Sequence, residues 1–289
     1  MKEYNNNNNK VLQRSVVQAD KHCESCPAHH ASNLKAMGVD VSSAEYVVAL
    51  AGNPNTGKST IFNALTGLRQ HTGNWPGKTV ARAEGGFSFR GTKFRLVDLP
   101  GAYSLLSASA DEQIARDFLL FGQPDVTVVV ADASRLERSL LLAVQIMEIT
   151  ARIVVCVNLT DEAGESGITV DPRALARELG VPVALTAARS KAGLPELLDA
   201  IHGIATGEIV CSPTLDFSLP KHAEEAVGEL SREIRQQYPH LPNPRWIAQR
   251  LLGGDESVEK ALRYETSAAR ITGIADDNLM LPVLVSGAV

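Results

Sequence analysis

The chain has 289 residues, of which 44% are hydrophobic and 21% are charged, and its formal net charge is −5. This composition predicts a soluble globular protein of one or two domains. The acidic balance argues against a basic face for DNA or RNA, so we expect no nucleic-acid partner. No run of 18 apolar residues and no secretory signal is visible, and four cysteines are too few for a disulfide scaffold. These features favour a cytoplasmic protein.

Three changes in sequence pattern divide the chain. Residues 1–43 lack sustained periodicity and contain an Asn run, which favours a disordered N-terminal segment. From residue 44 to 206, short apolar runs alternate with segments of helical spacing, which predicts an α/β fold with a mostly parallel sheet flanked by helices. The expected strands are residues 46–51, 87–89, 94–99, 126–131, 153–157 and 181–185. The expected helices are residues 58–66, 107–121, 136–150, 171–179 and 194–204, with Asp171 as an N-cap.

The remaining chain has helical spacing without strands. Residues 207–275 are expected to form a small all-helical regulatory domain, since the prolines at 239, 242 and 244 separate its periodic segments. Residues 276–289 form an apolar tail that holds Pro282 and Gly287. This tail is either a packed strand or the cut edge of something longer.

A phosphate-binding loop is the first functional signal. The sequence GNPNTGKS at residues 52–59 fits G-x-x-x-x-G-K-[ST], between an expected strand and an expected helix. Such a loop turns its backbone N–H groups around a phosphate, and the following helix adds the positive end of its dipole. Lys58 would contact the β- and γ-phosphates, and Ser59 would offer its hydroxyl to Mg²⁺. The expected nucleotide-binding residues here are Gly52, Asn53, Asn55, Thr56, Gly57, Lys58, Ser59 and Thr60.

Three later signals each follow an expected strand. Asp98 of DLPG would hold Mg²⁺, and Gly101 would offer its N–H to the γ-phosphate. Asp161 of NLTD would accept hydrogen bonds from N1 and N2 of guanine, a donor pair that adenine lacks, so an ATPase is disfavoured. The further expected nucleotide-binding residues are Asn158, Thr186, Ala187 and Ala188, the last three in a loop whose backbone could meet guanine O6. Carboxyl ends of parallel strands are where such sheets bind ligands, so these signals predict a site for GTP or GDP with Mg²⁺. A Rossmann dehydrogenase is disfavoured because no GxGxxG follows the first strand.

At this point the chain resembles the cytoplasmic N-terminal portion of the ferrous iron transport protein B (FeoB) family, from about residue 46 to 263. The segments that carry this resemblance are GNPNTGKST at 52–60, HTGNWPGKTV at 71–80, DLPGAYSL at 98–105, NLTDEA at 158–163 and RWIAQRLLGGD at 245–255. The resemblance implies a P-loop GTPase domain of the Ras-like type. It also implies a helical domain that tunes nucleotide affinity and links the GTPase to a membrane permease.

The resemblance also implies roles for single residues. Thr79 would bind Mg²⁺ and sense the γ-phosphate, with residues 73–78 as the first switch and residues 101–106 as the second. Asn55 would support a K⁺ ion that neutralises developing charge. The expected catalytic residues are thus Lys58, Thr79, Gly101 and Asn55. Ala102 replaces the Gln that orients water in many GTPases, which predicts a slow intrinsic rate. Leu159 and Ala187 replace a Lys and a Ser that are common in the base site, which predicts looser binding.

The function that the resemblance implies is a GTP-hydrolysing switch that couples nucleotide state to Fe²⁺ uptake. The permease expected of the family is absent from this chain, so either the chain is a fragment of a longer transporter or the permease is another polypeptide. Joined or bound to a permease, the chain would lie at the cytoplasmic face of the inner membrane. Two alternatives stay open: a ribosome- or tRNA-associated GTPase, which should carry a basic surface, and a nucleotide sensor or scaffold with little hydrolysis. The oligomeric state is not predicted.

A second group of chemically active side chains lies near the N-terminus. The sequence HCESCPAHH at residues 22–30 places Cys23 and Cys26 close to His29 and His30. These four residues could hold Zn²⁺ or Fe²⁺. They could also contain a redox pair or form a His-rich tail without a role, and the sequence leaves the three interpretations open. Cys156 lies in an apolar run and is interpreted as a buried thiol.

Overall fold

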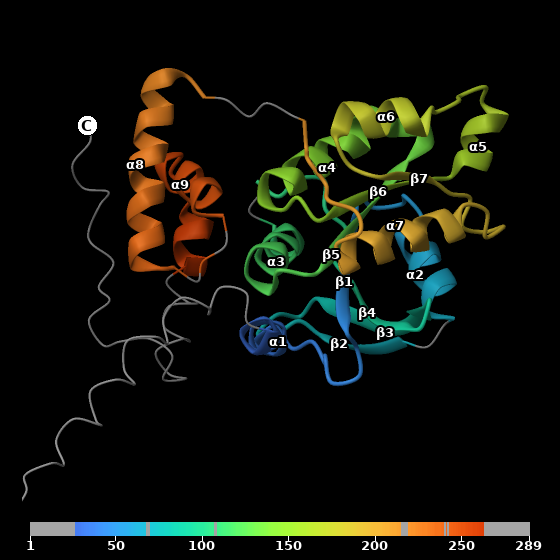
Figure 1. Cartoon of the computed structure of the whole chain (residues 1–289), viewed down its shortest axis with the longest axis horizontal. Coiled ribbons are helices and arrows are strands. Elements are labelled where there is room, and N and C mark those ends of the chain that lie inside the picture. Colours follow the sequence, from blue (N-terminus) through green and yellow to red (C-terminus); the bar gives the residue numbers. More distant parts are fainter. Residues whose placement is uncertain are drawn as a thin grey trace, which may run out of the picture.

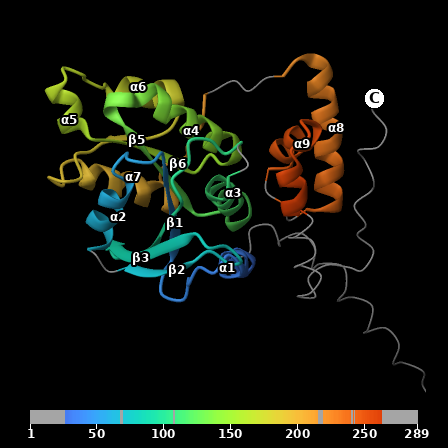
Figure 2. The same cartoon turned by 180° about the vertical axis from the view of Figure 1, so that it is seen from behind.

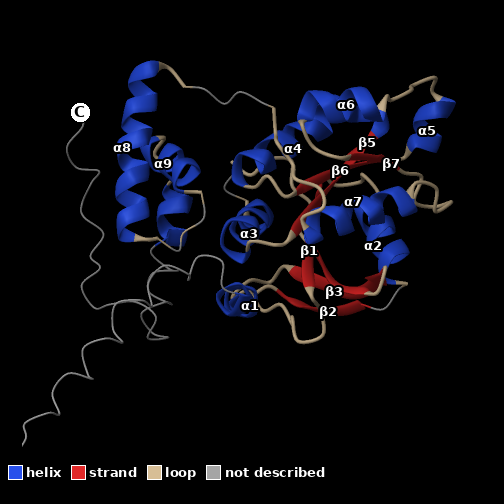
Figure 3. Cartoon of the chain, in the orientation of Figure 1, coloured by secondary structure: helices blue, strands red, loops and turns tan. Residues whose placement is uncertain are grey.

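The structure, a computed structural model, describes residues 27–67, 70–106, 109–214, 219–239, 241 and 243–262. A sheet with helices on both faces is followed by a pair of helices that lies beside it, as the two opposite views in Figures 1 and 2 show. The strands form a single layer between helices (Figure 3). The predicted class, a mostly parallel α/β sheet followed by a helical unit, is confirmed.

The described strands form one seven-stranded sheet in the order β2-β3-β4-β1-β5-β6-β7. The pairs β4·β1, β1·β5, β5·β6 and β6·β7 are parallel, whereas β2·β3 and β3·β4 are antiparallel. The bounds are β1 Tyr46–Gly52, β2 Gln70–Asn74, β3 Ala81–Phe89, β4 Thr92–Asp98, β5 Val126–Asp132, β6 Ile153–Asn158 and β7 Val183–Leu185. The strands β1, β5 and β6 are almost continuous apolar runs because both of their faces are covered.

Helices bury the two faces of the sheet in two separate cores. Successive side chains of a strand point to opposite faces, so Val47 and Ala49 enter one core and Val48 and Leu50 enter the other. The core around Val48 is covered by α2 (Lys58–Thr66) and α7 (Leu194–Thr206). The core around Val47 is covered by α1 (Pro27–Ala36), α3 (Ala110–Asp117), the π-helical turn η1 (Phe118–Gly122), η2 (Ala133–Arg135), α4 (Leu136–Ile149), α5 (Thr160–Glu165) and α6 (Pro172–Leu179).

The helical unit packs on the α3–α4 side of the sheet. It contains α8 (Lys221–Gln237), α9 (Pro244–Leu252) and a further helical stretch at residues 256–262. Trp246 of α9 is buried in the same core as α3 and α4. Hydrogen bonds cross between the parts: Arg116 Nη1 donates to Ser257 Oγ at 2.7 Å, and Asn243 Nδ2 donates to the Glu148 carbonyl at 2.5 Å and to the Ile149 carbonyl at 3.3 Å. The two parts therefore share one continuous apolar core in this structure.

Local sequence signals explain where several of the helices and strands begin or end. The predicted N-cap is confirmed, since Asp171 accepts hydrogen bonds from Arg173 N and Ala174 N at 2.9 and 3.1 Å. Arg90 and Gly91 form the turn that joins β3 to β4, and both have positive φ. The helix expected over residues 107–121 begins at Ala110 and ends in η1.

Four elements were not predicted: helix α1, strand β2, helix α5 and the 3-10 turn η2. Helix α1 lies within the segment for which the sequence favours disorder, and strand β2 is polar and lacks the alternation of a strand. Tertiary contacts form both: Leu34 of α1 is buried against the sheet core, and β2 pairs with β3 along its length. Among the described residues, no helix combines the length and the apolar character that a bilayer span requires.

Candidate functional site

The phosphate loop joins the end of β1 to the start of α2. Asn55 and Gly57 have φ of 68° and 80°, so the backbone reverses its curvature twice before the helix begins at Lys58. The loop is tightly held, because Thr56 Oγ1 donates to the Asn53 carbonyl at 2.9 Å and a Cβ on Gly52 would meet the Val130 carbonyl at 2.7 Å. This geometry is that of a concave backbone nest in front of a helix N-terminus, which suits an anion.

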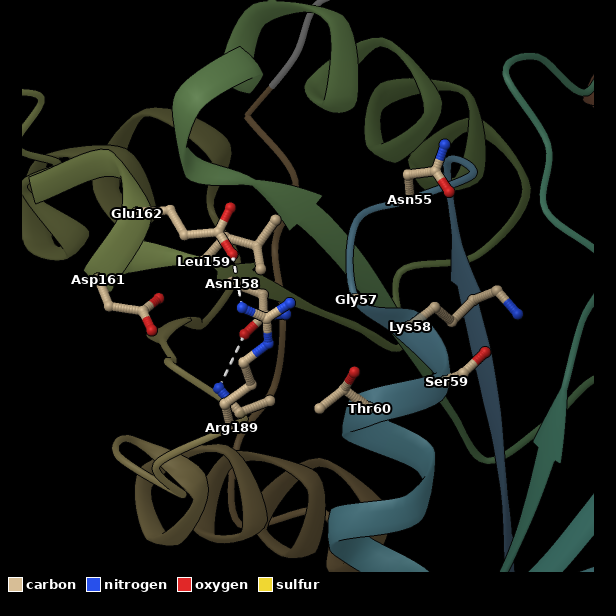
Figure 4. Close-up of a pocket in the computed structure, with 11 residues that line it drawn as sticks. Asn55, Gly57, Lys58, Ser59, Thr60, Asn158, Leu159, Asp161, Glu162 and Arg189 are labelled. Atoms are coloured by element: carbon tan, nitrogen blue, oxygen red, sulfur yellow. Dashed lines mark hydrogen bonds and ion pairs between the residues drawn. The ribbon is translucent and has the colours of Figure 1, made fainter. Parts of the chain in front are cut away.

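A cavity of about 380 Å³ opens directly over this loop. Figure 4 shows the loop residues on one side and the α5 residues on the other. Its lining residues are Asn55, Gly57, Lys58, Ser59, Thr60, Asn158, Leu159, Asp161, Glu162, Ala188 and Arg189. The structure thus brings together residues from three distant sequence segments that were predicted to form one nucleotide site. Of the predicted residues, Gly52, Asn53, Thr56, Thr79, Asp98, Gly101, Thr186 and Ala187 do not line this cavity.

Asn158, at the end of β6, connects the phosphate loop to the loop after β7. Its side chain is 0% exposed, and its Nδ2 donates to the Thr56 carbonyl at 3.0 Å. Its Oδ1 accepts from Thr186 Oγ1 at 3.0 Å and from Ala188 N at 3.1 Å. The Cys156 thiol lies 3.2 Å from Thr186 Oγ1, and burial raises the pKa of this thiol to about 12. Asn158 therefore fixes the relative position of two loops that line the cavity.

The rim of the cavity is polar and partly charged. Asp161 and Glu162 lie in the first turn of α5, both exposed, after Leu159 in a left-handed conformation with φ of 62°. Glu162 accepts from Arg189 Nη1 at 3.2 Å, so these two side chains meet at the cavity's edge (Figure 4). No role was predicted for Glu162 or Arg189, although each directly follows a predicted nucleotide residue. The Ala188 N–H already donates to Asn158 Oδ1. To donate to guanine O6, it would have to bond both oxygens at once or give up the bond to Asn158.

The Lys58 side chain does not point toward the part of the cavity where Asp161 is predicted to bind the guanine base. In Figure 4 its side chain extends away from Asp161. It forms an ion pair with Asp98 at the end of β4 and donates to the Leu99 carbonyl at 2.7 Å. Burial raises the pKa of Asp98 above its usual range, and the charge of Lys58 opposes that rise. The cation predicted for phosphate and the carboxylate predicted for Mg²⁺ thus neutralise each other in this structure.

The second switch begins in contact with the phosphate loop. Ala102 N donates to the Gly52 carbonyl at 3.3 Å, and a Cβ on Gly101 would lie 3.2 Å from Pro54 Cγ. Ala102 is buried. The following residues are tied to α4, since Leu105 N donates to Gln145 Oε1 at 2.7 Å. The predicted proximity of Gly101 to the phosphate loop therefore exists, with no polar side chain at position 102.

The first switch forms part of the edge hairpin. Residues 75–80 make the turn between β2 and β3, closed by hydrogen bonds from Trp75 N to the Val80 carbonyl and from Lys78 N to the Trp75 carbonyl, both 3.0 Å. Thr79 is exposed in this turn and lies outside the cavity lining. Trp75 is 3% exposed and packs edge-on against Phe118, with ring centroids 5.4 Å apart. Ser59 therefore lines the cavity, whereas Thr79 does not.

The N-terminal Cys/His group lies mostly outside the described residues. This applies to Cys23 and Cys26, while His29 and His30 fall in the first turn of α1, where only the backbone is described. Within the described ranges, no three His, Cys, Asp or Glu side chains gather as metal ligands would. The three interpretations of this group stay predictions.

Comparisons with known proteins agree with this geometry. The family described as ferrous iron transport protein B matches residues 46–201, and the FeoB cytosolic helical domain matches residues 220–277. An Fe(2+) transporter FeoB from Salmonella choleraesuis is 38% identical over 239 residues, which are 80% of this chain and 30% of that protein. The chain therefore spans less than a third of the length of that relative.

Solved structures give the same result. The cytosolic domain of the T. maritima FeoB iron transporter in a GDP form aligns with a TM-score of 0.68 at 38% identity, covering 75% of this chain and 84% of that one. The same domain in a GMPPNP form aligns with a TM-score of 0.68 at 36% identity, covering 75% and 85%. In these two alignments the matched region covers 75% of this chain and 84% or 85% of the solved structure. The chain belongs to the ferrous iron transport protein B family, of which it contains the P-loop GTPase domain and the cytosolic helical domain.

Proposed function

We propose that this chain binds GTP with Mg²⁺, hydrolyses it slowly, and uses the nucleotide state to control ferrous iron uptake through a membrane permease. The observation that carries the proposal is one cavity lined by both the phosphate loop and Asp161. The domain limits that we propose are 44–206 for the GTPase and 207–275 for the helical domain. We also propose that the chain acts at the cytoplasmic face of the membrane.

Specificity for guanine rests on Asp161. Its carboxylate accepts two hydrogen bonds from N1 and N2 of guanine, whereas adenine offers no such pair. The network around Asn158 supports this role, because it fixes the loop after β7 against the phosphate loop before any base arrives. Lys58 then leaves Asp98 and contacts the β- and γ-phosphates.

The donor atoms near the phosphate loop fit Mg²⁺. Ser59 offers a hydroxyl at the cavity wall and Asp98 a carboxylate at the end of β4, and hard divalent cations prefer oxygen ligands. Ser59, Asp98 and, after a movement of the first switch, Thr79 would hold this ion. Bound Mg²⁺ neutralises charge on the phosphate oxygens. The Asn55 side-chain oxygen at the cavity edge would similarly hold K⁺.

The names of the relatives support the wider proposal. The S. choleraesuis relative is an Fe(2+) transporter, and the T. maritima structures are of a cytosolic domain in GDP and GMPPNP forms. This relation supports our proposal of a partner permease and of Fe²⁺ as the transported ion. A ribosome- or tRNA-associated GTPase is disfavoured by the family match across both domains.

The test is GTP turnover by the purified chain under single- and multiple-turnover conditions, in KCl and in NaCl. We expect slow hydrolysis that is faster in KCl and that loses this difference in Asn55→Ala. Asn63→Ala is the matched control, since Asn63 lies on α2 and outside the cavity lining. Equal rates in the two salts would remove the K⁺ role, and binding without turnover would favour a sensor or scaffold.

Nucleotide preference is tested separately with Asp161→Asn. We expect GTP affinity to fall roughly 100-fold, the loss expected for two hydrogen bonds to a charged group. Affinity for xanthosine triphosphate should rise, because an amide N–H can meet the carbonyl that replaces the guanine amino group. Glu165→Gln is the control, because Glu165 is exposed in the same helix α5 and lies outside the cavity lining. Unchanged GTP affinity in Asp161→Asn would refute the guanine contact.

A further inference from the structure

An N-terminal arm packs against the GTPase outside the region that matches the family. We define the arm as residues 31–45, which run from α1 to the start of β1, whereas the family match begins at residue 46. Leu34 and Val39 of the arm are each 1% exposed and belong to the core that contains Trp75 and Phe118. Helix α1 ends in a glycine cap, in which Val39 N donates to the Leu34 carbonyl at 2.9 Å. The arm is therefore a packed element of the domain.

The arm touches the first switch at Gly38. This glycine has φ of 82°, and a Cβ added there would lie 2.2 Å from Arg82 Nη1 and 3.3 Å from Pro76 Cγ. Arg82 Nη1 also donates to the Met37 carbonyl at 3.0 Å. The positive φ favours glycine at this position, and a side chain added there would displace the Arg82 guanidinium and press on Pro76.

Arg82 connects this contact to the interior of the switch turn. Its guanidinium lies 5.6 Å from the Trp75 ring centroid, and its Nε pairs with Glu84 Oε1 at 2.8 Å. Glu84 is buried, so the orientation of Arg82 is fixed from two sides. Trp75, held by Arg82 and Phe118, anchors the turn that carries Thr79.

The far end of the arm is tied to the sheet. Arg95 Nη2 donates to Ser43 Oγ at 3.0 Å, and Glu45 N donates to the Lys93 carbonyl at 2.9 Å. The arm is therefore anchored on both sides of Gly38, by Leu34 in the core and by these bonds to β4. A segment fixed at two points resists displacement of the turn that packs beneath it.

We propose that the N-terminal arm holds the first switch in the edge hairpin and that Arg82 is the positioning residue through which it does so. Thr79 reaches the nucleotide only when this turn leaves its place beside the arm. The arm therefore sets the fraction of molecules that are competent for hydrolysis, and weakening its contact raises that fraction. This inference rests on the proposed GTPase function for its effect on turnover, but its effect on the switch turn is independent of it.

The test uses the full chain with Gly38→Ala. The matched control is Gly91→Ala, since Gly91 has nearly the same φ, 84°, but open space around it in the β3–β4 turn. Hydrogen exchange is followed at the amides of Trp75 and Lys78, whose bonds close the switch turn. We expect exchange roughly fivefold faster than in Gly91→Ala, the change expected from one lost hydrogen bond. The kcat for GTP should rise by a similar factor while KM stays within about twofold.

A second variant keeps the proposal testable if Gly38→Ala fails to fold. Leu34→Ala loosens the arm at its core anchor without touching the switch turn, and should give the same faster exchange at Trp75 and Lys78. Arg82→Gln should also speed this exchange, and Arg82→Lys should restore it only in part because Lys lacks the planar fork. Unchanged exchange in both arm variants overturns the proposal. Faster exchange with unchanged kcat overturns the link to hydrolysis, whereas no turnover in any variant, wild type included, contradicts only the proposed function.

Discussion

The two halves of the nucleotide cavity differ in how far they are assembled. On the base side, Asn158 makes three hydrogen bonds that join the phosphate loop to the loop after β7, and no part of its side chain is exposed. On the switch side, Lys58 is paired with Asp98, and Thr79 is exposed in a hairpin turn. The loops of the base side are therefore held in place, with the Ala188 N–H donating to Asn158, while the switch side must exchange one set of contacts for another.

This difference separates recognition from hydrolysis. A preorganised base side costs little rearrangement on binding, so GTP and GDP should both be recognised. The arrangement that would hold Mg²⁺ forms only if Lys58 moves to phosphate and the turn with Thr79 leaves its packed position. A switch requires two such arrangements, with the nucleotide favouring one of them.

The largest expected effect comes from breaking the base side at Asn158. Asn158→Ala leaves the Thr186 hydroxyl and the Ala188 N–H without their buried acceptor, which should lower the free energy of unfolding by about 3 kcal/mol. GDP affinity should fall roughly 100-fold, because the two loops lose their common anchor. Urea denaturation and titration with a fluorescent GDP measure these quantities. Asn63→Ala on α2 is the control, and a variant that binds GDP within about threefold of wild type would contradict the preassembled base side.

A smaller effect, on GDP affinity, is expected from a substitution of Asp98 on the switch side. Asp98→Asn removes the ion pair that holds Lys58 away from phosphate, so GDP should bind roughly tenfold more tightly when Mg²⁺ is chelated. With Mg²⁺ present this gain should disappear, because the carboxylate ligand is lost. Titration of GDP in EDTA and in MgCl₂ measures both. The control is Asp132→Asn at the end of β5, which β1 separates from β4, because it removes the same charge without touching Lys58. If Asp98→Asn weakened binding in EDTA, the ion pair would not be the competing contact.

The smallest effect concerns Asp117, where the switch side meets the helical unit. Burial raises the pKa of this carboxyl, and its bonds to Arg116 at 2.9 and 2.7 Å oppose the rise. The folded protein therefore binds more protons at this site than the unfolded chain, and the stability that Asp117 contributes falls as pH rises from 3.8 through the raised value. The free energy of unfolding of wild type minus that of Asp117→Asn should therefore decrease as the pH rises.

Urea unfolding from pH 4 to pH 7 measures this difference. Asp111→Asn provides the baseline, since Asp111 is exposed in the first turn of the same helix α3. A difference that grows with pH would mean that the bonds to Arg116 outweigh burial.

Local sequence signals were enough to predict the α/β class, the phosphate loop, and the presence of Asn158, Asp161 and Ala188 around the cavity. These signals are glycine at positive φ, apolar runs long enough for buried strands, and polar residues directly after them. Parallel strands bring their carboxyl ends to one edge of the sheet, so local signals at those ends combine into one site. For the same reason Asp161 and Lys58 were predicted to line one cavity although about 100 residues separate them.

The direction of Lys58 and the position of the first switch depend instead on contacts between distant segments. A lysine has a long flexible side chain, and its partner depends on which opposite charge is nearest in space. Helix α1 and strand β2 lack a periodic apolar stripe. Tertiary contacts stabilise them instead: Leu34 of α1 is buried in the core, and β2 pairs with β3. The contact of Gly38 with Arg82 joins segments more than 40 residues apart, and no local pattern encodes it.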